Sequence, residues 1–260
     1  MAYSGTTLPI SVFCVMQDEE DNIARLLSSL RNIDEVILVD SGSTDRTVHI
    51  ASQYENVNIV YHPWEGYAKQ KQYAMALCKN EWVLNLDADE VLCPALYKKI
   101  EHIITLDHIC GVRCARNDIF IYKKLSSLTK QPNNLRLYRK SQAEFDESAL
   151  VHESATVTGK IMVINEAFDH YGYNDIASLS SKNNQYSTLK SQQKFNRGKK
   201  GSLLKLGLIF PLTFIKKFVL QRYIFSGRRG FILSVMDAYY AFMKEAKLFE
   251  LEQKSEKQKE

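Results

Sequence analysis

The run Trp82-Val83-Leu84-Asn85-Leu86-Asp87-Ala88-Asp89-Glu90 decides the fold, because an apolar segment passes directly into a cluster of carboxylates. A short apolar run without glycine or proline predicts a buried strand over residues 82–86. Side chains alternate along an extended chain, so Asp87 and Asp89 are expected to point to the same side. The alternative is a solvated turn without a binding role. The position of the pair at the end of a predicted strand argues against that alternative.

The alternation of strand and helix extends from this run toward the N-terminus. Three further apolar runs predict strands, over residues 10–15, 35–39 and 57–61. Apolar residues at helical spacing predict the intervening helices, over residues 22–30, 44–54 and 67–78. Ser43 or Thr44 is a plausible cap of the second helix. Strands separated by helices imply a largely parallel sheet, in which ligands bind beyond the carboxyl ends of the strands.

Polar clusters follow three of the predicted strands and are therefore expected to meet on one rim of the sheet. These clusters are residues 17–20, 40–45 and 87–90. Farther along, the pattern predicts a helix over 96–106 and then three more strands. The strands are expected over residues 110–122, 134–140 and 161–170, and helices dominate from residue 176 onward. The fold class is mixed α/β, with a mostly parallel sheet flanked by helices and a helical C-terminal segment.

The two parts of the chain differ in charge. Residues 176–236 contain twelve Lys or Arg and no Asp or Glu, which leaves 22 basic and 30 acidic residues elsewhere. The longest charge-free run there, residues 206–215, has only ten residues and contains Pro211. A membrane-spanning helix needs about twenty apolar residues. We therefore expect an interfacial element that contacts an anionic membrane surface. The alternative is a core-packing helix with a solvated basic face.

Nucleic acid is not an expected partner, because no recognisable nucleic-acid-binding module accompanies the charge. The five cysteines form no CxxC pair, and their odd number fits a reducing compartment. Cys110 and Cys114 with two nearby histidines match no common zinc spacing. Residues 1–9 lack the basic head and apolar run of a signal peptide, so a cytoplasmic location is expected.

The carboxylates on the predicted rim suit a divalent cation and a phosphorylated ligand. Mg²⁺ prefers oxygen ligands and is commonly shared between one or two carboxylates and substrate phosphates, which indicates Asp87 and Asp89. Asp40 ends a strand, where it can accept a hydrogen bond from a base or a ribose. Backbone N–H groups from Ser41 onward are suited to phosphate or ribose contact. Alternatively, Asp40 and Asp45 only cap the turn and helix, and for Asp45 capping is the favoured interpretation.

Seven motifs are distributed along the chain: Asp18-Glu19-Glu20-Asp21-Asn22-Ile23, Val39-Asp40-Ser41-Gly42-Ser43-Thr44-Asp45-Arg46-Thr47, Trp64-Glu65-Gly66-Tyr67, Gln70-Lys71, Leu86-Asp87-Ala88-Asp89-Glu90, Leu135-Arg136-Leu137-Tyr138-Arg139-Lys140 and Val151-His152-Glu153. Together they resemble family 2 glycosyltransferases of the GT-A nucleotide-diphospho-sugar transferase fold. Within that family, the chain most resembles lipopolysaccharide core glucosyltransferases that act on inner-core heptose, and the resemblance covers about residues 8–250.

The resemblance implies roles for particular residues. Asp40 would hold the uracil or ribose of a UDP-sugar, with Glu19 nearby and Ser41 beside it. Asp87 and Asp89 would form the Asp-x-Asp motif that handles ribose, diphosphate and a Mg²⁺ or Mn²⁺ ion. Lys71 would face the nucleotide or the diphosphate. His152 and His170 are candidates for contact with the diphosphate or the metal.

An inverting reaction is implied as well, with one general base that deprotonates the acceptor hydroxyl. Glu153 is the expected base, and Asp146 and Glu147 are the alternatives. Four positions depart from the pattern of the subgroup: Asp18 and Gln72, each in place of Asn, Ala68 in place of Gly, and Ser226-Gly227-Arg228-Arg229-Gly230 in place of an acidic Asp-Gly form. The last departure concerns the acceptor more than the chemistry.

The resemblance also implies an organisation and a function. A catalytic domain is expected over residues 1–175, with a nucleotide-sugar part at about 8–95 and an acceptor part at about 96–175. Residues 176–260 would form the helical, basic, membrane-associating segment. The expected enzyme transfers a hexose, glucose from UDP-glucose, to an inner-core heptose of lipopolysaccharide or lipooligosaccharide. It would be cytoplasmic and bound peripherally to the inner face of the inner membrane of a Gram-negative bacterium.

Three alternatives stay open. In the first, the enzyme transfers another hexose, or uses a polyprenyl-linked or capsular acceptor. In the second, the mechanism is retaining instead of inverting. In the third, the protein keeps the fold but only binds a sugar nucleotide or an anionic lipid. A base near the anomeric carbon separates the catalytic from the non-catalytic reading, and Glu153 favours catalysis.

Overall fold

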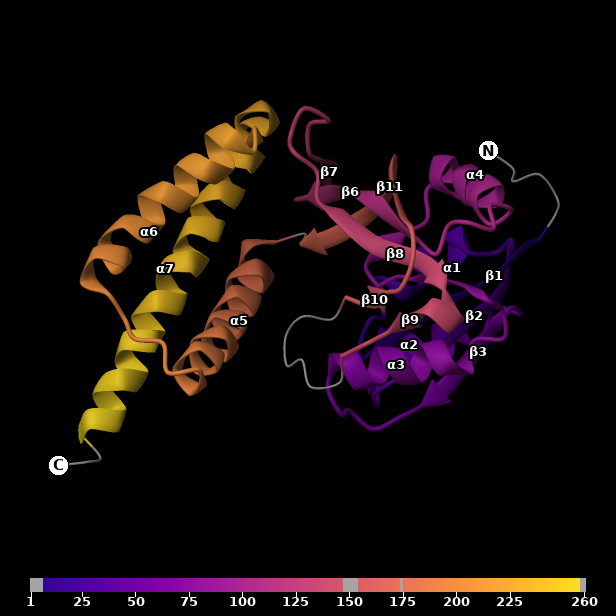
Figure 1. The fold of residues 1–260 in the computed structure, drawn as a ribbon, viewed down its shortest axis with the longest axis horizontal. Helices are drawn as coiled ribbons and strands as arrows, with labels where there is room; N and C mark the ends of the chain where they lie inside the picture. Colours follow the sequence, from indigo (N-terminus) through magenta and orange to yellow (C-terminus); the bar gives the residue numbers. More distant parts are fainter. Residues whose placement is uncertain (1–6, 147–153, 174, 258–260) are drawn as a thin grey trace. The chain divides into compact units, whose positions relative to one another are not determined.

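The computed structural model describes residues 7–146, 154–173 and 175–257. By their contacts these residues form two compact units, which are described separately. The first, the sheet unit, comprises Met1–Asn117 and Pro132–Tyr171, and the second, the helical unit, comprises Asp118–Gln131 and Gly172–Glu260. Figure 1 shows the strands and helices of both units.

The first half of the sheet is parallel, as the alternation of strands and helices predicted. β1 (Leu8–Met16) lies between β2 (Ile33–Asp40) and β4 (Trp82–Asn85), and β3 (Val57–Tyr61) pairs with the outer side of β2. The connecting helices are α1 (Ile23–Ser29), α2 (Thr47–Ala51) and α3 (Tyr67–Leu77). The prediction for α2 was wrong at both ends, since the expected helix covered residues 44–54. Residues 41–46 instead form a loop whose N–H groups bind carboxylates.

The second half of the sheet is antiparallel. β4 pairs with β8 (Asn133–Arg139), which pairs with β6 (Gly111–Phe120), and the order continues through β11 (Ile161–Tyr173) to β5 (Glu90–Val91). α4 (Pro94–Ile103) follows β5, and a short sheet joins β9 (Ala143–Glu144) to β10 (Thr156–Val157). Three of these strands match predicted strands closely. β5 was not predicted, because two residues carry no periodicity.

Two apolar cores lie on the two faces of the sheet in the first unit. Alternate residues of one strand enter different cores: Val12 and Cys14 of β1 pack with α1 and α4, whereas Phe13 packs with α3. Neighbouring β2 behaves in the same way, with Leu38 on one face and Ile37 on the other. Burial on both faces explains why these strands read as continuous apolar runs. The sheet is therefore a fixed platform for the loops at its ends.

A tight hairpin begins the helical unit. β6 ends at Phe120, two residues before the predicted end, because Ile121 and Tyr122 take positive φ angles of 47° and 59°. Two consecutive positive φ angles are typical of a two-residue hairpin turn, which returns the chain as β7 (Lys123–Lys124).

Three long helices make up most of the rest of this unit, with the short helices η2 (Lys216–Leu220) and η3 (Tyr223–Ser226) between the last two. α5 (Ile176–Asn196) and α6 (Leu203–Ile215) both pack against α7 (Gly227–Lys257), as Figure 1 shows. Asp175 caps α5 by accepting a hydrogen bond from the Ser178 N–H at 2.7 Å. Near the start of α7, a Cβ at Gly230 would lie 1.8 Å from the Tyr223 carbonyl oxygen, so only glycine fits there. No helix in the described residues is long and apolar enough to cross a bilayer.

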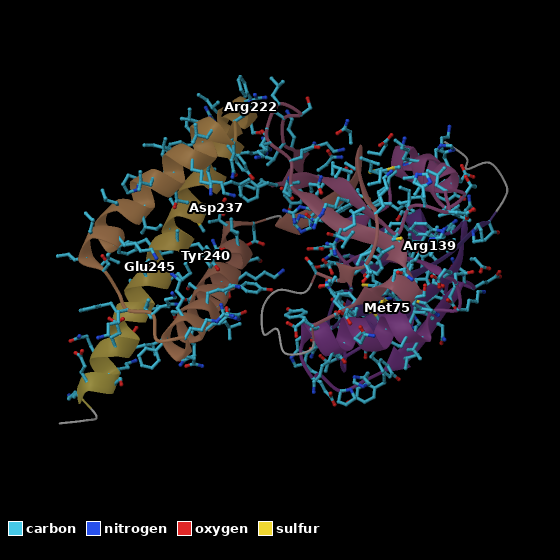
Figure 2. The ribbon with its side chains drawn as sticks, in the orientation of Figure 1. Met75, Arg139, Arg222, Asp237, Tyr240 and Glu245 are labelled. Atoms are coloured by element: carbon cyan, nitrogen blue, oxygen red, sulfur yellow. The ribbon has the colours of Figure 1, made fainter. Side chains whose placement is uncertain are left out.

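A buried carboxylate links these three helices. Glu245 of α7, labelled in Figure 2, is 3% exposed and forms ion pairs with Lys194 of α5 and Lys205 of α6. The Lys205 ammonium lies 3.3 Å from the Glu245 carboxylate. Burial alone would raise the pKa of Glu245, but hydrogen bonds and charges from the two lysines lower it below its usual range.

Candidate active site

The three polar clusters meet at the carboxyl ends of β1, β2 and β4, which confirms the predicted rim. Met16 at the end of β1 is in register with Asp40 at the end of β2. The Ser41 N–H continues this pairing by donating to the Met16 carbonyl at 3.0 Å. On the other side of β1, the Leu86 N–H donates to Phe13 at 3.2 Å and carries the chain into Asp87. Adjacent parallel strands therefore place the clusters side by side.

The Asp40 carboxylate is 6% exposed and binds its own loop. It accepts hydrogen bonds from the Gly42 N–H at 3.1 Å, from the Ser43 N–H at 3.1 and 3.2 Å and from the Ser43 hydroxyl at 2.5 Å. These bonds use about as many acceptor positions as an ionised carboxylate has. Asp40 thus fixes the loop after β2, and its direct contact with a nucleotide remains a prediction.

A second set of hydrogen bonds joins the loop after β1 to the loop after β2. The Asp18 carboxylate accepts from the Thr44 N–H at 2.7 Å, and the Glu19 N–H donates to the Thr47 hydroxyl at 2.7 Å. Asp45 accepts from the Thr47 N–H at 2.9 Å and so holds the turn before α2, but the N-cap of that helix is Arg46, which makes no side-chain cap bond. The capping interpretation favoured for Asp45 therefore applies to the turn and not to the helix. Sequence reasoning did not find the role of Asp18, which takes φ 53° to reach its partners.

A pocket of about 360 Å³ opens beside these loops. Its lining residues come from β1, the loops after β1, β2 and β3 and the first residue of α3: Val15, Met16, Gln17, Glu19, Ser41, Trp64 and Tyr67. The Trp64 and Tyr67 rings meet edge to face with centroids 4.6 Å apart, and both are partly exposed. The volume lies within the range of small-molecule sites, and the aromatic wall suits a planar ring.

Buried Gln70 holds the Ser41 side of this pocket. Its Nε2 donates to the Ser41 hydroxyl at 2.9 Å, and its Oε1 lies 2.5 Å from Nδ1 of His62. In the sequence, Gln70 and Trp64 are parts of motifs, and no role was predicted for either residue. Trp64 and Tyr67, on either side of Gly66, follow a predicted strand. This pattern could have indicated an aromatic wall that binds a planar ring.

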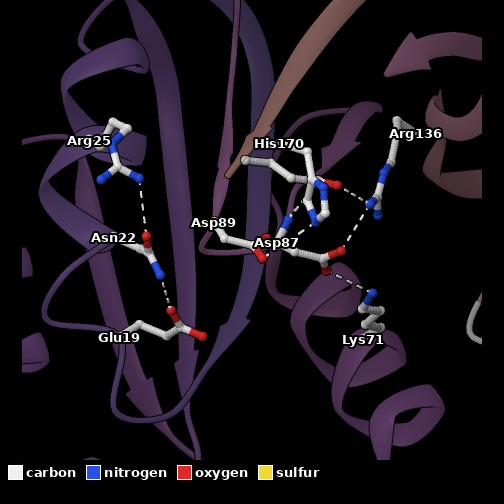
Figure 3. A network of polar contacts seen from close by, with 9 residues as sticks. Glu19, Asn22, Arg25, Lys71, Asp87, Asp89, Arg136 and His170 are labelled. Carbon is white, nitrogen blue, oxygen red and sulfur yellow. Dashed lines mark hydrogen bonds and ion pairs between the residues drawn. The ribbon is translucent and has the colours of Figure 1, made fainter. Parts of the chain in front are cut away.

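Two cations hold the Asp87 carboxylate (Figure 3). Lys71 of α3, 4% exposed, donates to Oδ1 at 3.0 Å, and Arg136 of β8, 8% exposed, donates to Oδ2 at 2.9 Å. Burial alone would raise the pKa of Asp87, but the charges of Lys71 and Arg136 outweigh it and hold the pKa well below its usual range. Asp87 is therefore a fixed anion, and Lys71 faces it directly.

Arg136 also pairs with Glu90, which is 1% exposed. A Glu90 oxygen accepts from the Asp87 N–H at 3.0 Å, so Glu90 supports the turn that presents the carboxylates. Burial raises the pKa of Glu90 to about 7, and the Arg136 charge acts in the opposite direction. In the sequence, Arg136 is part of a motif, and no role in the site was predicted for it.

Asp89 lies beside His170 of β11, with 3.5 Å between the Asp89 carboxylate and Nε2 of the imidazole. The two side chains are 18% and 19% exposed, and the Tyr171 N–H binds the Asp89 carbonyl at 2.8 Å. A carboxylate and an imidazole are suitable ligands for a divalent transition-metal ion. Within the described residues, no group of three or more potential metal ligands converges. The Asp89–His170 pair offers two ligands, and a divalent cation commonly takes further ligands from substrate phosphates.

A chain of contacts leads from Glu19 to the same strand as His170. Asn22 donates to the Glu19 carboxylate at 2.8 Å, and Arg25 donates to Asn22 at 3.1 Å. The Arg25 guanidinium lies 4.1 Å from the centre of the Tyr171 ring. Figure 3 shows Glu19, Asn22 and Arg25 in line. This chain was not predicted from the sequence, because its members lie on three separate elements.

The candidates for the general base are not placed by these contacts. Glu147, His152 and Glu153 lie outside the described residues. Asp146 is described and is exposed, directly after Phe145 and the short strand β9. The choice of Glu153 over Asp146 and Glu147 therefore remains a prediction.

The chain is similar to known proteins over most of its length. Residues 11–172 match the family model described as "Glycosyl transferase family 2". An uncharacterised glycosyltransferase of Rickettsia typhi is 36% identical over 259 residues, which span 95% of this chain and 88% of that protein. The lipopolysaccharide core biosynthesis glycosyltransferase LpsC of Rhizobium meliloti is 33% identical over 250 residues, which span 94% of this chain and 93% of that protein.

A solved structure supports the fold. The mannosyltransferase PcManGT of Pyrobaculum calidifontis, in complex with GDP-Man and Mn²⁺, matches with a TM-score of 0.58 over 94% of this chain and 88% of that chain. Only 11% of the residues are identical, so this likeness concerns the fold alone. The predicted GT-A nucleotide-diphospho-sugar transferase fold is confirmed.

Proposed function

The chain belongs to glycosyltransferase family 2, and we propose that it is an inverting enzyme that transfers glucose from UDP-glucose to an inner-core heptose of lipopolysaccharide or lipooligosaccharide. One observation supports the assignment of the donor. Asp87, which is paired with two basic side chains, lies next to the Asp89–His170 pair, on the same rim as a pocket with an aromatic wall. The LpsC relative, named for lipopolysaccharide core biosynthesis, supports the acceptor part.

In this proposal the pocket receives the base of the nucleotide. Trp64 and Tyr67 supply an aromatic wall, and Glu19 and Ser41 supply hydrogen-bonding groups at its polar side. Asp40 holds the Ser41–Ser43 loop in shape for the ribose. Asp87, kept ionised by Lys71 and Arg136, accepts hydrogen bonds from ribose hydroxyls.

A divalent cation, Mg²⁺ or Mn²⁺, completes the donor site. Asp89 and His170 would hold it, with diphosphate oxygens as further ligands. When bound, the cation neutralises charge on the departing diphosphate. The two paired oxygens of Asp87 make it a poor direct ligand, so we assign the metal to Asp89 and not equally to both aspartates. Lys71 and Arg136 add positive charge on the same side.

Transfer requires a base on the face of the sugar opposite the diphosphate. We assign this role to Glu153, with Asp146 and Glu147 as alternatives, in the acceptor part at residues 96–175. The carboxylate takes the proton of the heptose hydroxyl while the hydroxyl oxygen bonds to the anomeric carbon. The bond from that carbon to the UDP oxygen breaks, and UDP leaves with the electron pair, which inverts the anomeric configuration.

The helical unit would hold the enzyme on an anionic membrane where the lipid-linked acceptor resides. No residue of α6 is buried, and Leu203, Leu204 and Leu220 are 87%, 73% and 70% exposed. Exposed apolar side chains beside basic ones, without acidic residues over 176–236, suit an anionic lipid interface. The exposure of α6 argues against the core-packing alternative. We propose a location on the cytoplasmic face of the inner membrane of a Gram-negative bacterium.

The test supplies the purified protein with UDP-glucose, Mg²⁺ and a heptose-containing core glycolipid, and measures UDP release and product mass. We expect a product heavier by one hexose, which is lost in Asp89→Asn and Glu153→Gln and kept in the control Asp107→Asn, a fully exposed site. UDP binding without turnover on any acceptor would favour the non-catalytic alternative. Product only with another sugar nucleotide, or only on a polyprenyl-linked acceptor, would replace the assigned donor or acceptor.

A further inference from the structure

A groove of about 410 Å³ lies between α5 and α7 of the helical unit, and neither the proposed donor site nor the membrane surface uses it. Both walls belong to this unit. The lining residues are Ala177, Ser180, Ser181, Asn183 and Asn184 of α5 and Tyr239, Tyr240 and Met243 of α7. Figure 2 labels Tyr240 on α7. The volume is within the range of small-molecule sites.

The chemistry of this lining differs from that of its surroundings. Residues 176–236 contain twelve basic residues and no acidic one, yet no lining residue of the groove carries a formal charge. The walls instead offer hydroxyls, carboxamides and two phenol rings. A phosphate or a carboxylate would find no cation in the lining. A neutral ligand rich in hydroxyl groups matches it better.

The carboxamides of the groove form hydrogen bonds with residues outside its lining. Asn183 Nδ2 lies 3.5 Å from the Met236 carbonyl, and Asn184 Oδ1 accepts from the Lys247 ammonium at 2.7 Å. Lys247 also binds the hydroxyls of Ser187 and Thr188, so its position is fixed by several bonds. Each carboxamide thus keeps its other polar atom for a ligand, in a fixed orientation.

Three hydroxyl groups of the groove have no hydrogen-bond partner among the described residues. In the described part of the chain, the Ser180, Ser181 and Tyr239 hydroxyls make no hydrogen bond, although all three residues line the groove. Tyr239 is 42% exposed, so a large part of its surface is accessible to a ligand. An aromatic face beside fixed carboxamides and hydroxyls is complementary to a sugar ring, which has apolar C–H faces and a polar rim.

We propose that the α5–α7 groove is a binding site for a neutral saccharide. The ring of Tyr239 packs against a C–H face of the sugar, and the Asn183, Asn184 and Ser181 side chains bind its hydroxyls. The site holds glycan without any part in the transfer of the hexose, so it stands whether or not the proposed reaction is correct.

Methionine methyl resonances test this site and the donor pocket separately. Met243 lines the groove, Met16 lines the donor pocket, and Met75 is buried in the core of the sheet unit. Full-length protein with ¹³C-methyl methionine is titrated with maltotriose and with dephosphorylated core oligosaccharide, at concentrations that saturate a millimolar site. We expect a saturable shift of Met243 with at least one saccharide and no shift of Met75. UDP should shift Met16 alone, and its failure would count against the donor site only.

Variants and other probes decide the assignment. Tyr239→Ala, on α7, should lower the affinity for the saccharide by about tenfold or more. Leu189→Ala, an exposed site on α5 outside the lining, should leave the affinity unchanged. A helical circular dichroism spectrum and a thermal transition like those of the original protein show that the helical unit of each variant is folded. The proposal is overturned if neither saccharide moves Met243, if Tyr239→Ala has no effect, or if inorganic phosphate or anionic lipid vesicles shift Met243 as strongly as the saccharides do.

Discussion

The Arg136 guanidinium donates to the Asp87 carboxylate at 2.9 Å, across 49 positions of sequence. Asp87 follows the last parallel strand of the sheet, and Arg136 lies on the adjacent antiparallel strand β8. The antiparallel half of the sheet therefore holds the carboxylate that the parallel half presents. The same guanidinium pairs with Glu90, so one side chain fixes both ends of the turn at residues 87–90.

Replacing Arg136 with Met should destabilise the sheet unit by about 3–5 kcal/mol, because it leaves buried Glu90 without its partner. Urea unfolding followed by circular dichroism measures the loss. The double variant Arg136→Met with Glu90→Gln should recover part of it, since the remaining buried group is then neutral. Equal losses in the single and double variants would show that the Glu90 charge is not the cause.

Replacing Trp64 with Ala should weaken UDP binding by about 1–3 kcal/mol, the usual value of stacking between a base and an aromatic ring. Titration calorimetry with UDP measures the change, and Trp64→Phe should retain much of the affinity. Trp82→Phe is the control, because Trp82 is buried in the sheet-unit core that contains α1 and α4, away from the pocket. Its indole N–H makes no hydrogen bond in the described structure. Equal affinity of Trp64→Ala and the original protein would remove Trp64 from the base site.

Asp89→Asn and His170→Gln should each lower the affinity for Mn²⁺ in the presence of UDP by at least about tenfold, or about 1.4 kcal/mol. Electron paramagnetic resonance of free Mn²⁺ gives the affinity directly. We expect Asp87→Asn to affect UDP binding more than Mn²⁺ binding, because Lys71 and Arg136 occupy both of its carboxylate oxygens. The reverse order would place the cation on Asp87.

Glu245→Gln should change how the helical unit responds to acid. The lysines hold the folded pKa of Glu245 below its unfolded value, so this ion pair stabilises the fold above the unfolded pKa. The stabilisation is lost as the pH falls through the lower, folded pKa. In Glu245→Gln the acid-dependent loss of helical circular dichroism should be smaller, and stability near neutral pH should be lower. An unaltered acid transition would exclude Glu245 as its source.

Leu203→Gln combined with Leu204→Gln should reduce binding to vesicles that contain anionic lipid, because both side chains are exposed at the start of α6. Flotation with anionic and with neutral vesicles measures binding, and raised salt should weaken it further. Leu189→Gln, on α5, is the matched control for an exposed leucine. Vesicle binding that survives the double variant would place the membrane contact elsewhere.

The sequence by itself determined the parallel half of the sheet and its polar rim. Strand β3 was predicted with its observed bounds, and β4 differs from its prediction by one residue. Apolar periodicity is a local signal, and strands joined by helices bring their carboxyl ends together in any parallel sheet. Asp40 and Asp87 could therefore be assigned to one rim without knowledge of the packing.

Only the tertiary structure decided the partners of those carboxylates. Arg136 and His170 lie on antiparallel strands, where a shift of one residue turns every side chain to the other face. That register depends on packing between segments far apart in the chain, and no local pattern encodes it. The start of α2 was missed for a related reason, because the Asp18 carboxylate, from another loop, accepts from the Thr44 N–H and holds that residue in the loop before the helix.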